Sequence, residues 1–263
     1  MSIDLAKKSG EAPGLVIYLT AGDPDLATSR DAALAAIDAG AGAIELGVPF
    51  SDPVADGPVI QRASERALAQ GVRLKDVLSL AAELRRLRPQ AGLIIFSYFN
   101  PILRLGLEQF CERAAAAGVD GTLITDVIVE EAGEYLDATR RFGLKPIFLA
   151  APTSPDERLK RIAEASQGFV YAISRTGITG AQQELAADAR DLCRRLRSFT
   201  SLPLAVGFGI SRPEHVAAVG AFADAAVVGS AVVSCIEGSA PGEAPARISQ
   251  LIQGLRPTVA VTG

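Results

Sequence analysis

Short apolar runs alternate with longer helical patterns along almost the whole chain. Eight of these runs predict β-strands, because each is a continuous apolar stretch that ends in turn residues. A continuous apolar run, in contrast to an alternating one, is expected of a strand that is covered on both faces, as in a parallel sheet. The predicted strands cover residues 14–20, 43–46, 93–98, 121–124, 146–150, 168–173, 202–206 and 225–228.

Helical spacing of apolar residues follows each predicted strand. The predicted helices cover residues 26–39, 59–69, 74–87, 107–117, 130–141, 155–165, 185–199, 213–219, 231–236 and 244–255. Eight strand–helix units in 263 residues predict an α/β fold: a closed (β/α)8 TIM barrel with an extra N-terminal helix and short extra helices. The main alternative is a doubly wound open sheet, and the lack of an early glycine-rich dinucleotide motif counts against it. We expect residues 1–263 to form one barrel domain.

Composition excludes several classes of partner. The formal net charge of −4 argues against a nucleic-acid surface and against an anionic membrane. The three cysteines, Cys111, Cys193 and Cys235, are scattered and give neither a disulfide framework nor a metal-binding spacing. The single histidine, His215, has no second metal ligand at a suitable spacing. From these cysteines and this histidine we expect no metal. No apolar run reaches membrane length and the N-terminus lacks a signal-like core, so we expect a cytoplasmic protein.

The segment ELGVPFSDPVADGPVIQ (residues 45–61) combines acids with prolines and glycines, and it is predicted to be the end of the strand 43–46 followed by a long loop. Long loops of this kind inside compact domains are usually functional. Glu45 sits in an apolar run, where burial would raise the pKa of its carboxyl and suit it to proton transfer. Asp56 follows eleven residues later, so the loop can fold back and bring both carboxylates to one pocket. A Pro-rich turn with solvated acids explains the same residues equally well at this point.

Glycines follow the last two predicted strands, at Gly207 and Gly209 and then at Gly229-Ser230. Barrels commonly bind phosphate there, through backbone N–H groups and the N-terminus of a short helix. Tight turns explain one such cluster more easily than two. Gly177 and Gly180 in the preceding loop are candidates for a lid over the same group. The residues therefore predict an enzyme that acts on a phosphorylated small molecule.

Aromatic residues lie at or next to the ends of the predicted strands, in a chain with only 5% aromatic residues. They are Tyr18, Phe50, Tyr98, Tyr171 and Phe208. This concentration suggests a flat apolar part of the ligand, although each residue alone is equally explained as part of an ordinary core.

The segment 45–61 closely resembles the signature of the tryptophan synthase α subunit family, and the likeness runs over nearly the whole chain. Supporting stretches are YLTAGDPD (18–25), SYFNPI (97–102), APTSPDERLKRIAEAS (151–166), GFVYAISRTGITGA (168–181), VGFGISRPEHV (206–216) and VVGSAVV (227–233). The resemblance implies a (β/α)8 barrel that cleaves indole-3-glycerol phosphate to indole and glyceraldehyde 3-phosphate. It also implies an α2β2 heterotetramer with a β subunit that carries pyridoxal phosphate, with no cofactor in this chain.

The same resemblance implies roles for individual residues. Glu45 would be the general acid and base, Asp56 would bind the indole N–H, and Thr179 would hold Asp56 when the loop closes. The phosphate would lie on Gly180, Gly209, Gly229 and Ser230. The indole pocket would be walled by Tyr18, Tyr98, Tyr171 and Phe208. The side facing the β subunit would carry Pro49, Asp52, Asn100 and Asp126.

One loop departs from the family pattern. The family usually has a Pro-Asp-Leu-Pro type of turn after strand four, whereas this chain has ITDVIV at 124–129 without either proline. This difference leaves open a stand-alone indole-3-glycerol-phosphate lyase that releases free indole. A non-catalytic activator of a β subunit is the other alternative, and the intact pair of Glu45 and Asp56 argues against it.

Overall fold

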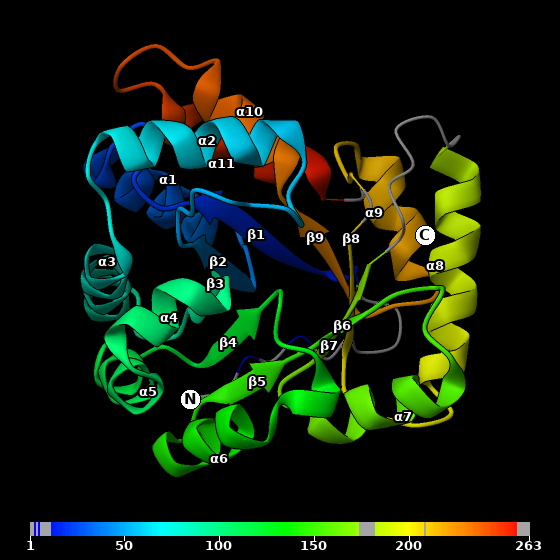
Figure 1. Ribbon diagram of the computed structural model, residues 1–263. Coiled ribbons are helices and arrows are strands. Elements are labelled where there is room, and N and C mark those ends of the chain that lie inside the picture. The colour runs from blue at the N-terminus through cyan, green and yellow to red at the C-terminus, as the bar shows by residue number, and fades with distance from the viewer. Residues whose placement is uncertain (1–2, 4, 6–11, 174–181, 208, 257–263) are drawn as a thin grey trace.

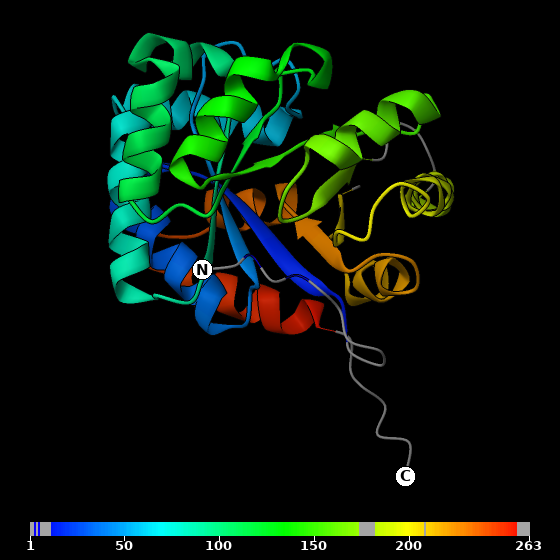
Figure 2. The ribbon, with the colours of Figure 1, turned by 90° about the horizontal axis from the view of Figure 1, so that it is seen from below.

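The computed structural model describes residues 3, 5, 12–173, 182–207 and 209–256. Within this part of the chain, nine parallel strands form one sheet that curves around a barrel with helices outside it (Figures 1 and 2). The strands are β1 (Gly14–Thr20), β2 (Ala43–Gly47), β3 (Gly92–Ser97), β4 (Gly121–Ile124), β5 (Lys145–Ile147), β6 (Leu149–Ala150), β7 (Val170–Ile173), β8 (Leu204–Gly207) and β9 (Ala225–Val228).

The helices follow the strands in the expected alternation. They are α1 (Leu26–Asp38), α2 (Pro58–Ala69), α3 (Leu74–Leu87), α4 (Phe99–Leu105), α5 (Leu107–Ala116), the 3-10 helix η1 (Val129–Glu131), α6 (Gly133–Phe142), α7 (Asp156–Ala165), α8 (Gln182–Leu196), α9 (Pro213–Gly220), α10 (Ser230–Glu237) and α11 (Ala244–Leu255). None of the described helices is long and apolar enough to span a membrane. The predicted short helix 59–69 is present as α2, whereas the predicted N-terminal helix lies outside the described residues.

The barrel closes at its fifth position, where the predicted strand 146–150 consists of two pieces. The strand order is β5-β4-β3-β2-β1-β9-β8-β7-β6, so the two pieces, β5 and β6, are the two edge strands of the sheet. On one side β5 pairs with β4. On the other side the Pro146 and Phe148 carbonyls accept the N–H groups of Gln167 (2.7 Å) and Tyr171 (3.1 Å). Strand five therefore contacts both neighbours, and the (β/α)8 prediction is confirmed.

The core has two layers, as expected for a sheet covered on both faces. An outer layer packs between the strands and the helices. An inner layer fills the barrel with side chains from successive strands, among them Val16, Ile94 and Phe169. Ile3 and Leu5 join this inner layer and lie against Gly121 and Gly14, at the beginnings of β4 and β1. The N-terminal end of the barrel is thus filled by apolar side chains, which leaves the C-terminal end of the strands for a ligand site.

Helix α4 covers residues for which the sequence predicts no helix, and Pro101 lies in its first turn. Proline is compatible with the first turn of a helix, where its missing N–H would have no intrahelical partner. Asp126 accepts the N–H of Phe99, the first residue of α4, at 2.7 Å. The loop after β4 therefore caps the helix that follows β3. The predicted helix 130–141 is also divided, into η1 and α6.

Two Arg–Asp pairs repeat the same arrangement at the N-terminal end of the barrel. Arg85 pairs with Asp120, whose Oδ2 also accepts the Leu93 N–H at 2.9 Å. Arg197 pairs with Asp224, whose Oδ2 accepts the Leu204 N–H at 2.7 Å. In each case an arginine at or just after the end of a helix fixes the aspartate that bridges two neighbouring strands.

Candidate active site

A cavity of about 250 Å³ lies at the C-terminal ends of the strands. It is lined by Tyr18, Glu45, Ala55, Asp56, Gly57, Ile60, Phe96, Thr125, Leu149, Tyr171, Ile173, Gly207, Gly209, Val227, Gly229 and Ser230. Active sites of (β/α)8 barrels are built at this end. The cavity brings together most of the described residues that the sequence predicted for a site.

Glu45 faces the barrel interior from the middle of β2. It lies in register with Tyr18 of β1 and Ile94 of β3, and Ile94 belongs to the inner core layer. Glu45 is fully buried, and neither of its carboxylate oxygens has a hydrogen-bond partner among the described residues. Burial raises the pKa of this carboxyl to about 8. Near neutral pH the group therefore carries a proton that it can give to a molecule in the cavity.

Asp56 lies on the acid loop, which we define as residues 51–57. The Tyr98 hydroxyl donates to Asp56 Oδ2 at 3.0 Å and accepts the Ala55 N–H at 2.9 Å. The Gln61 side-chain amide donates to the Asp56 carbonyl at 2.8 Å. Partial burial raises the pKa of the Asp56 carboxyl to about 6, against the opposing effect of the Tyr98 hydrogen bond. Near pH 7 these environments thus favour an ionised Asp56 and a protonated Glu45 in the same cavity.

Two tyrosines stand against glycines on neighbouring strands. A Cβ at Gly47 would lie 2.3 Å from the Tyr18 hydroxyl oxygen, and one at Gly207 would lie 2.7 Å from that of Tyr171. Only glycine leaves room for these rings at the cavity wall. Burial raises the pKa of both phenols well above its usual value, with the nearby carboxylates adding to the effect. Both tyrosines therefore stay neutral.

Helix α10 begins at the cavity wall. Its N-cap is Gly229 and its first residue is Ser230, and both line the cavity. The first N–H groups of a helix have no intrahelical partner, and they carry the positive end of the helix dipole. Gly209 lies beside them with φ of 79°, a left-handed conformation that glycine adopts without strain. This end of the cavity has the features of an anion site.

The residues predicted to face a partner follow three successive strands, β2, β3 and β4, at the same end of the barrel, and Asn100 lies in the first turn of α4. Asp52, Asn100 and Asp126 are exposed, whereas Pro49 is buried and adds nothing to a surface. The same loops and α4 expose Val54, Leu103 and Ile128, which are 87%, 56% and 43% accessible. These three apolar side chains therefore lie at the same end of the barrel as Asp52, Asn100 and Asp126.

Some predicted site residues lie elsewhere or outside the described part. Thr179, Gly180 and Phe208 fall outside the described residues, as does the predicted lid. Tyr98 is not part of the cavity wall, because its hydroxyl binds the acid loop and its ring packs on Phe50, with ring centroids 5.0 Å apart. Within the described residues, no group of three or more His, Cys, Asp or Glu side chains could hold a metal ion.

Several cavity residues were missed, and the main ones are apolar: Ile60, Phe96, Leu149, Ile173 and Val227. Most lie on strands, where alternation with a period of two assigns them to the inner face once the strand register is known. Gln61 ends the segment 45–61, and its bond to the acid loop depends on the turn between Asp56 and α2.

A sequence profile described as tryptophan synthase alpha chain matches residues 5–256. The chain belongs to the tryptophan synthase alpha chain family. The alpha chain of Solibacter usitatus is 51% identical over 230 residues, which span 88% of this chain and 86% of that protein. The alpha chain of Roseiflexus castenholzii is 48% identical over 242 residues, which span 92% and 93%.

Solved structures of tryptophan synthase show the same fold. A chain of the α2β2 complex from Pyrococcus furiosus superposes with a TM-score of 0.87 and 43% identity, over 93% of this chain and 98% of that one. A chain of tryptophan synthase from M. tuberculosis superposes with a TM-score of 0.85 and 36% identity, over 97% of each chain. The alpha chain family thus accounts for the barrel fold.

Proposed function

We propose that this chain is a lyase that cleaves indole-3-glycerol phosphate to indole and glyceraldehyde 3-phosphate, as the α subunit of a tryptophan synthase. The observation that carries the proposal is Glu45, a buried carboxyl that borders the cavity without a hydrogen-bond partner among the described residues. A buried polar group without a partner is costly to the fold, so a ligand that pairs with it explains why it is kept.

Glu45 would carry the proton in both directions. Its carboxylic acid protonates C3 of the indole ring, and the ring becomes a cationic indolenine. The resulting carboxylate accepts the proton of the glycerol C3′ hydroxyl as the C3–C3′ bond breaks. The electrons of that bond return to the ring, the aldehyde forms at C3′, and Glu45 is protonated again. A pKa of about 8 leaves the group protonated at the start of this cycle near neutral pH.

Asp56 would stabilise the positive charge that develops on the ring nitrogen. An ionised carboxylate accepts the ring N–H and is most effective where water is excluded. The Tyr98 hydroxyl favours the ionised form of Asp56, because a hydrogen bond to a carboxylate lowers its pKa. The acid loop is thereby held in the conformation and charge state that the reaction needs.

The phosphate of the substrate would bind at the N-terminus of α10. The N-terminus of α10, with Gly229 and Ser230, supplies N–H groups and a hydroxyl, and Gly209 lies beside it. Gly180 is assigned to the same group, and Thr179 to Asp56, on the family resemblance alone. Binding the phosphate there would fix the glycerol chain so that C3′ lies near Glu45.

A β subunit would dock on the rim that carries Asp52, Asn100 and Asp126, giving an α2β2 heterotetramer in which indole passes to the partner. The exposed Val54, Leu103 and Ile128 on that rim support an interface there. Pyridoxal phosphate would belong to the β subunit, and no step assigned to this chain uses it.

Release of indole from indole-3-glycerol phosphate by the purified protein, with and without a matching β subunit, tests the proposal. Weak cleavage alone that rises strongly with the β subunit supports the α subunit assignment. Strong cleavage that the β subunit leaves unchanged favours the stand-alone lyase, to which the proline-free loop 124–129 points. No cleavage under either condition refutes the lyase. Glu45→Gln should abolish cleavage while binding of the β subunit persists.

A further inference from the structure

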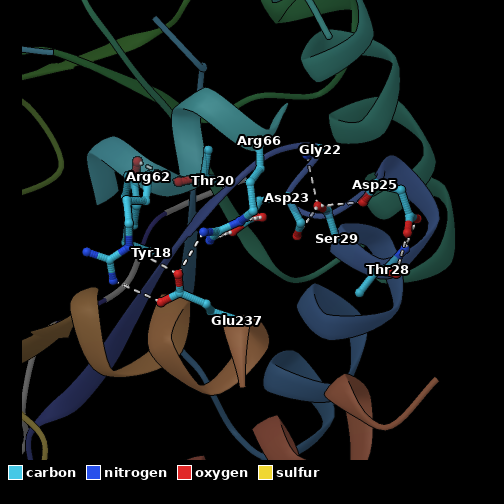
Figure 3. Close-up of polar contacts among 10 residues, drawn as sticks. All are labelled: Tyr18, Thr20, Gly22, Asp23, Asp25, Thr28, Ser29, Arg62, Arg66 and Glu237. Carbon is cyan, nitrogen blue, oxygen red and sulfur yellow. Dashed lines mark hydrogen bonds and ion pairs between the residues drawn. The ribbon is translucent and has the colours of Figure 1, made fainter. Parts of the chain in front are cut away.

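Four charged side chains that do not line the cavity form a cluster (Figure 3). They are Asp23, Arg62, Arg66 and Glu237, which we call the charge cluster. Asp23 lies in the turn after β1, the two arginines lie one turn apart on α2, and Glu237 is the last residue of α10. The cluster therefore joins three elements that border the cavity.

Arg66 is at the centre of the cluster. Its Nε and Nη2 donate to the two carboxylate oxygens of Asp23 at 2.7 and 2.8 Å, and its Nη1 donates to Glu237 at 2.8 Å. Arg62 makes a second forked contact with Glu237, at 3.1 and 3.0 Å. A planar guanidinium with bidentate partners fixes direction as well as distance, which a lysine ammonium cannot do. Arg66 thus sets the position of α2 against both neighbours.

The position of α2 matters because it begins at the acid loop. Asp56 immediately precedes Gly57, the N-cap of α2, and Ile60 in its first turn lines the cavity. Helix α10 begins at Ser230, in the anion site, and lies alongside α2 (Figure 1). The charge cluster thereby links the helix that directly follows Asp56 to the helix that would hold the phosphate.

The turn that carries Asp23 is itself held firmly. The Ser29 hydroxyl accepts the Gly22 N–H at 2.9 Å and donates to the Asp25 carbonyl at 3.0 Å. Asp25 caps α1 by accepting the Thr28 N–H at 2.7 Å. Asp23 is therefore a fixed point on the barrel to which Arg66 attaches α2.

Stability alone explains the cluster poorly. The Asp23 side chain is only 2% exposed, and a buried ion pair costs desolvation that an apolar pair of similar volume avoids. The pair of Arg62 and Glu237 is partly exposed, and such pairs contribute little. What the cluster adds is a defined geometry.

We propose that Arg66 is a positioning residue, which together with Asp23 and Glu237 holds Asp56 at the correct place relative to the anion site on α10. This inference rests on the proposed lyase function for its kinetic consequence, and on the contacts of α2 for its structural one. Loosening α2 displaces a group that acts on the reacting ring, and small displacements of such groups cost about 100-fold in rate. The loss is expected in kcat more than in KM.

The test compares Arg66→Met with Arg85→Met in the full chain. Arg85 also pairs with a buried aspartate, but at the N-terminal end of the barrel, so it controls for the loss of an Arg–Asp pair as such. Steady-state cleavage of indole-3-glycerol phosphate gives kcat and KM. Hydrogen exchange of the backbone amides in residues 51–57 reports the acid loop without any substrate.

We expect Arg66→Met to lower kcat by about 10- to 100-fold with a smaller change in KM, and to raise exchange in residues 51–57. Arg66→Lys should recover part of the rate, because an ammonium can still pair with Asp23. Arg85→Met should change neither kcat nor exchange in this loop below its melting temperature. Glu237→Gln is a milder variant that replaces Arg66→Met if the latter does not fold. If both fold, the loss of kcat in the double variant should be smaller than the sum of the two single losses, in free-energy terms.

Unchanged exchange in residues 51–57 of the Arg66 and Glu237 variants overturns the positioning role, whatever the activity. Equal losses of kcat in Arg66→Met and Arg85→Met overturn it as well, because they indicate general destabilisation. If the unsubstituted protein does not cleave the substrate, the lyase function fails, and the exchange measurement alone decides the positioning role.

Discussion

The Tyr98 hydroxyl donates to Asp56 Oδ2 at 3.0 Å, and the same oxygen accepts the Ala55 N–H at 2.9 Å. One phenol at the end of β3 thus fixes both the backbone and the carboxylate of the acid loop. Tyr98 is buried and its ring packs on Phe50, so the hydroxyl has little freedom to move away. The conformation of the loop after β2 depends on a residue that follows the next strand.

Tyr98→Phe removes this hydroxyl and keeps the ring. A hydrogen bond to a charged group is worth roughly 1.5–3 kcal/mol, so we expect kcat/KM for indole-3-glycerol phosphate to fall at least about tenfold. The pKa of Asp56 should rise above its value of about 6, because the hydrogen bond that favours the carboxylate is lost. Measurement of kcat/KM against pH checks both effects. An unchanged acidic limb would show that Tyr98 does not act through Asp56.

The two cavity carboxyls predict a bell-shaped pH profile. In the proposed mechanism, cleavage requires Asp56 ionised and Glu45 protonated in the free protein. With pKa values of about 6 for Asp56 and about 8 for Glu45, both conditions are met between these values. We expect kcat/KM to fall below pH 6, as Asp56 gains a proton, and above pH 8, as Glu45 loses one. Asp56→Asn should lower kcat/KM and remove the acidic limb of its pH profile, while the alkaline limb remains. A profile of this variant without the alkaline limb would contradict the role of Glu45.

The raised pKa of Glu45 also predicts that this carboxyl destabilises the fold as pH rises. Its folded-state pKa is about 8, against 4.5 for the unperturbed group. Between these values the folded chain holds a proton that the unfolded chain has released, so the free energy of unfolding falls with rising pH, by about 1.4 kcal/mol per unit. Above pH 8 both states are ionised and the penalty stays constant.

Glu45→Gln removes this penalty, because the amide is neutral at every pH. The variant should gain stability over the unsubstituted protein from pH 5 to pH 8, and the gain should then level off. Asp56 titrates in both proteins, so its contribution cancels in the difference. Urea unfolding at several pH values measures the gain. A difference that does not vary with pH would place the pKa of Glu45 near its ordinary value.

Much of this site could be predicted from the sequence, because the barrel fold converts order along the chain into position in space. Once eight strands are recognised, residues that follow different strands meet at one end. Glu45, Asp56, Gly229 and Ser230 were placed in one site in this way, and the cavity contains all four. The family motif supported the same residues independently.

The remaining features depend on contacts that no local pattern encodes. Tyr98 was expected in the cavity wall, but its contact with the acid loop depends on how residues 51–57 fold back. Pro49 was expected at a surface and is buried. The contact of Arg66 with Asp23 joins residues 43 positions apart, in elements that neither helical nor strand periodicity relates.

Gly207 and Tyr171 provide a steric test of the cavity wall. A Cβ at Gly207 would lie 2.7 Å from the Tyr171 hydroxyl oxygen but 3.3 Å from the ring carbon that bears it. Gly207→Ala should therefore displace the ring and raise KM, since overpacking of this kind costs about 1–3 kcal/mol. Tyr171→Phe combined with Gly207→Ala removes the shortest contact and should recover most of the loss that Gly207→Ala causes alone.

Gly133→Ala is the matched control for this pair. Gly133 is the first residue of α6, and a Cβ there would have no heavy atom within 4 Å. That substitution should leave kcat and KM unchanged and add a few tenths of a kcal/mol of stability, because alanine is the better helix former. If Gly207→Ala alone leaves KM unchanged, the ring of Tyr171 has room to move. If the double variant is no better than Gly207→Ala, the loss comes from the backbone of β8 and not from the tyrosine.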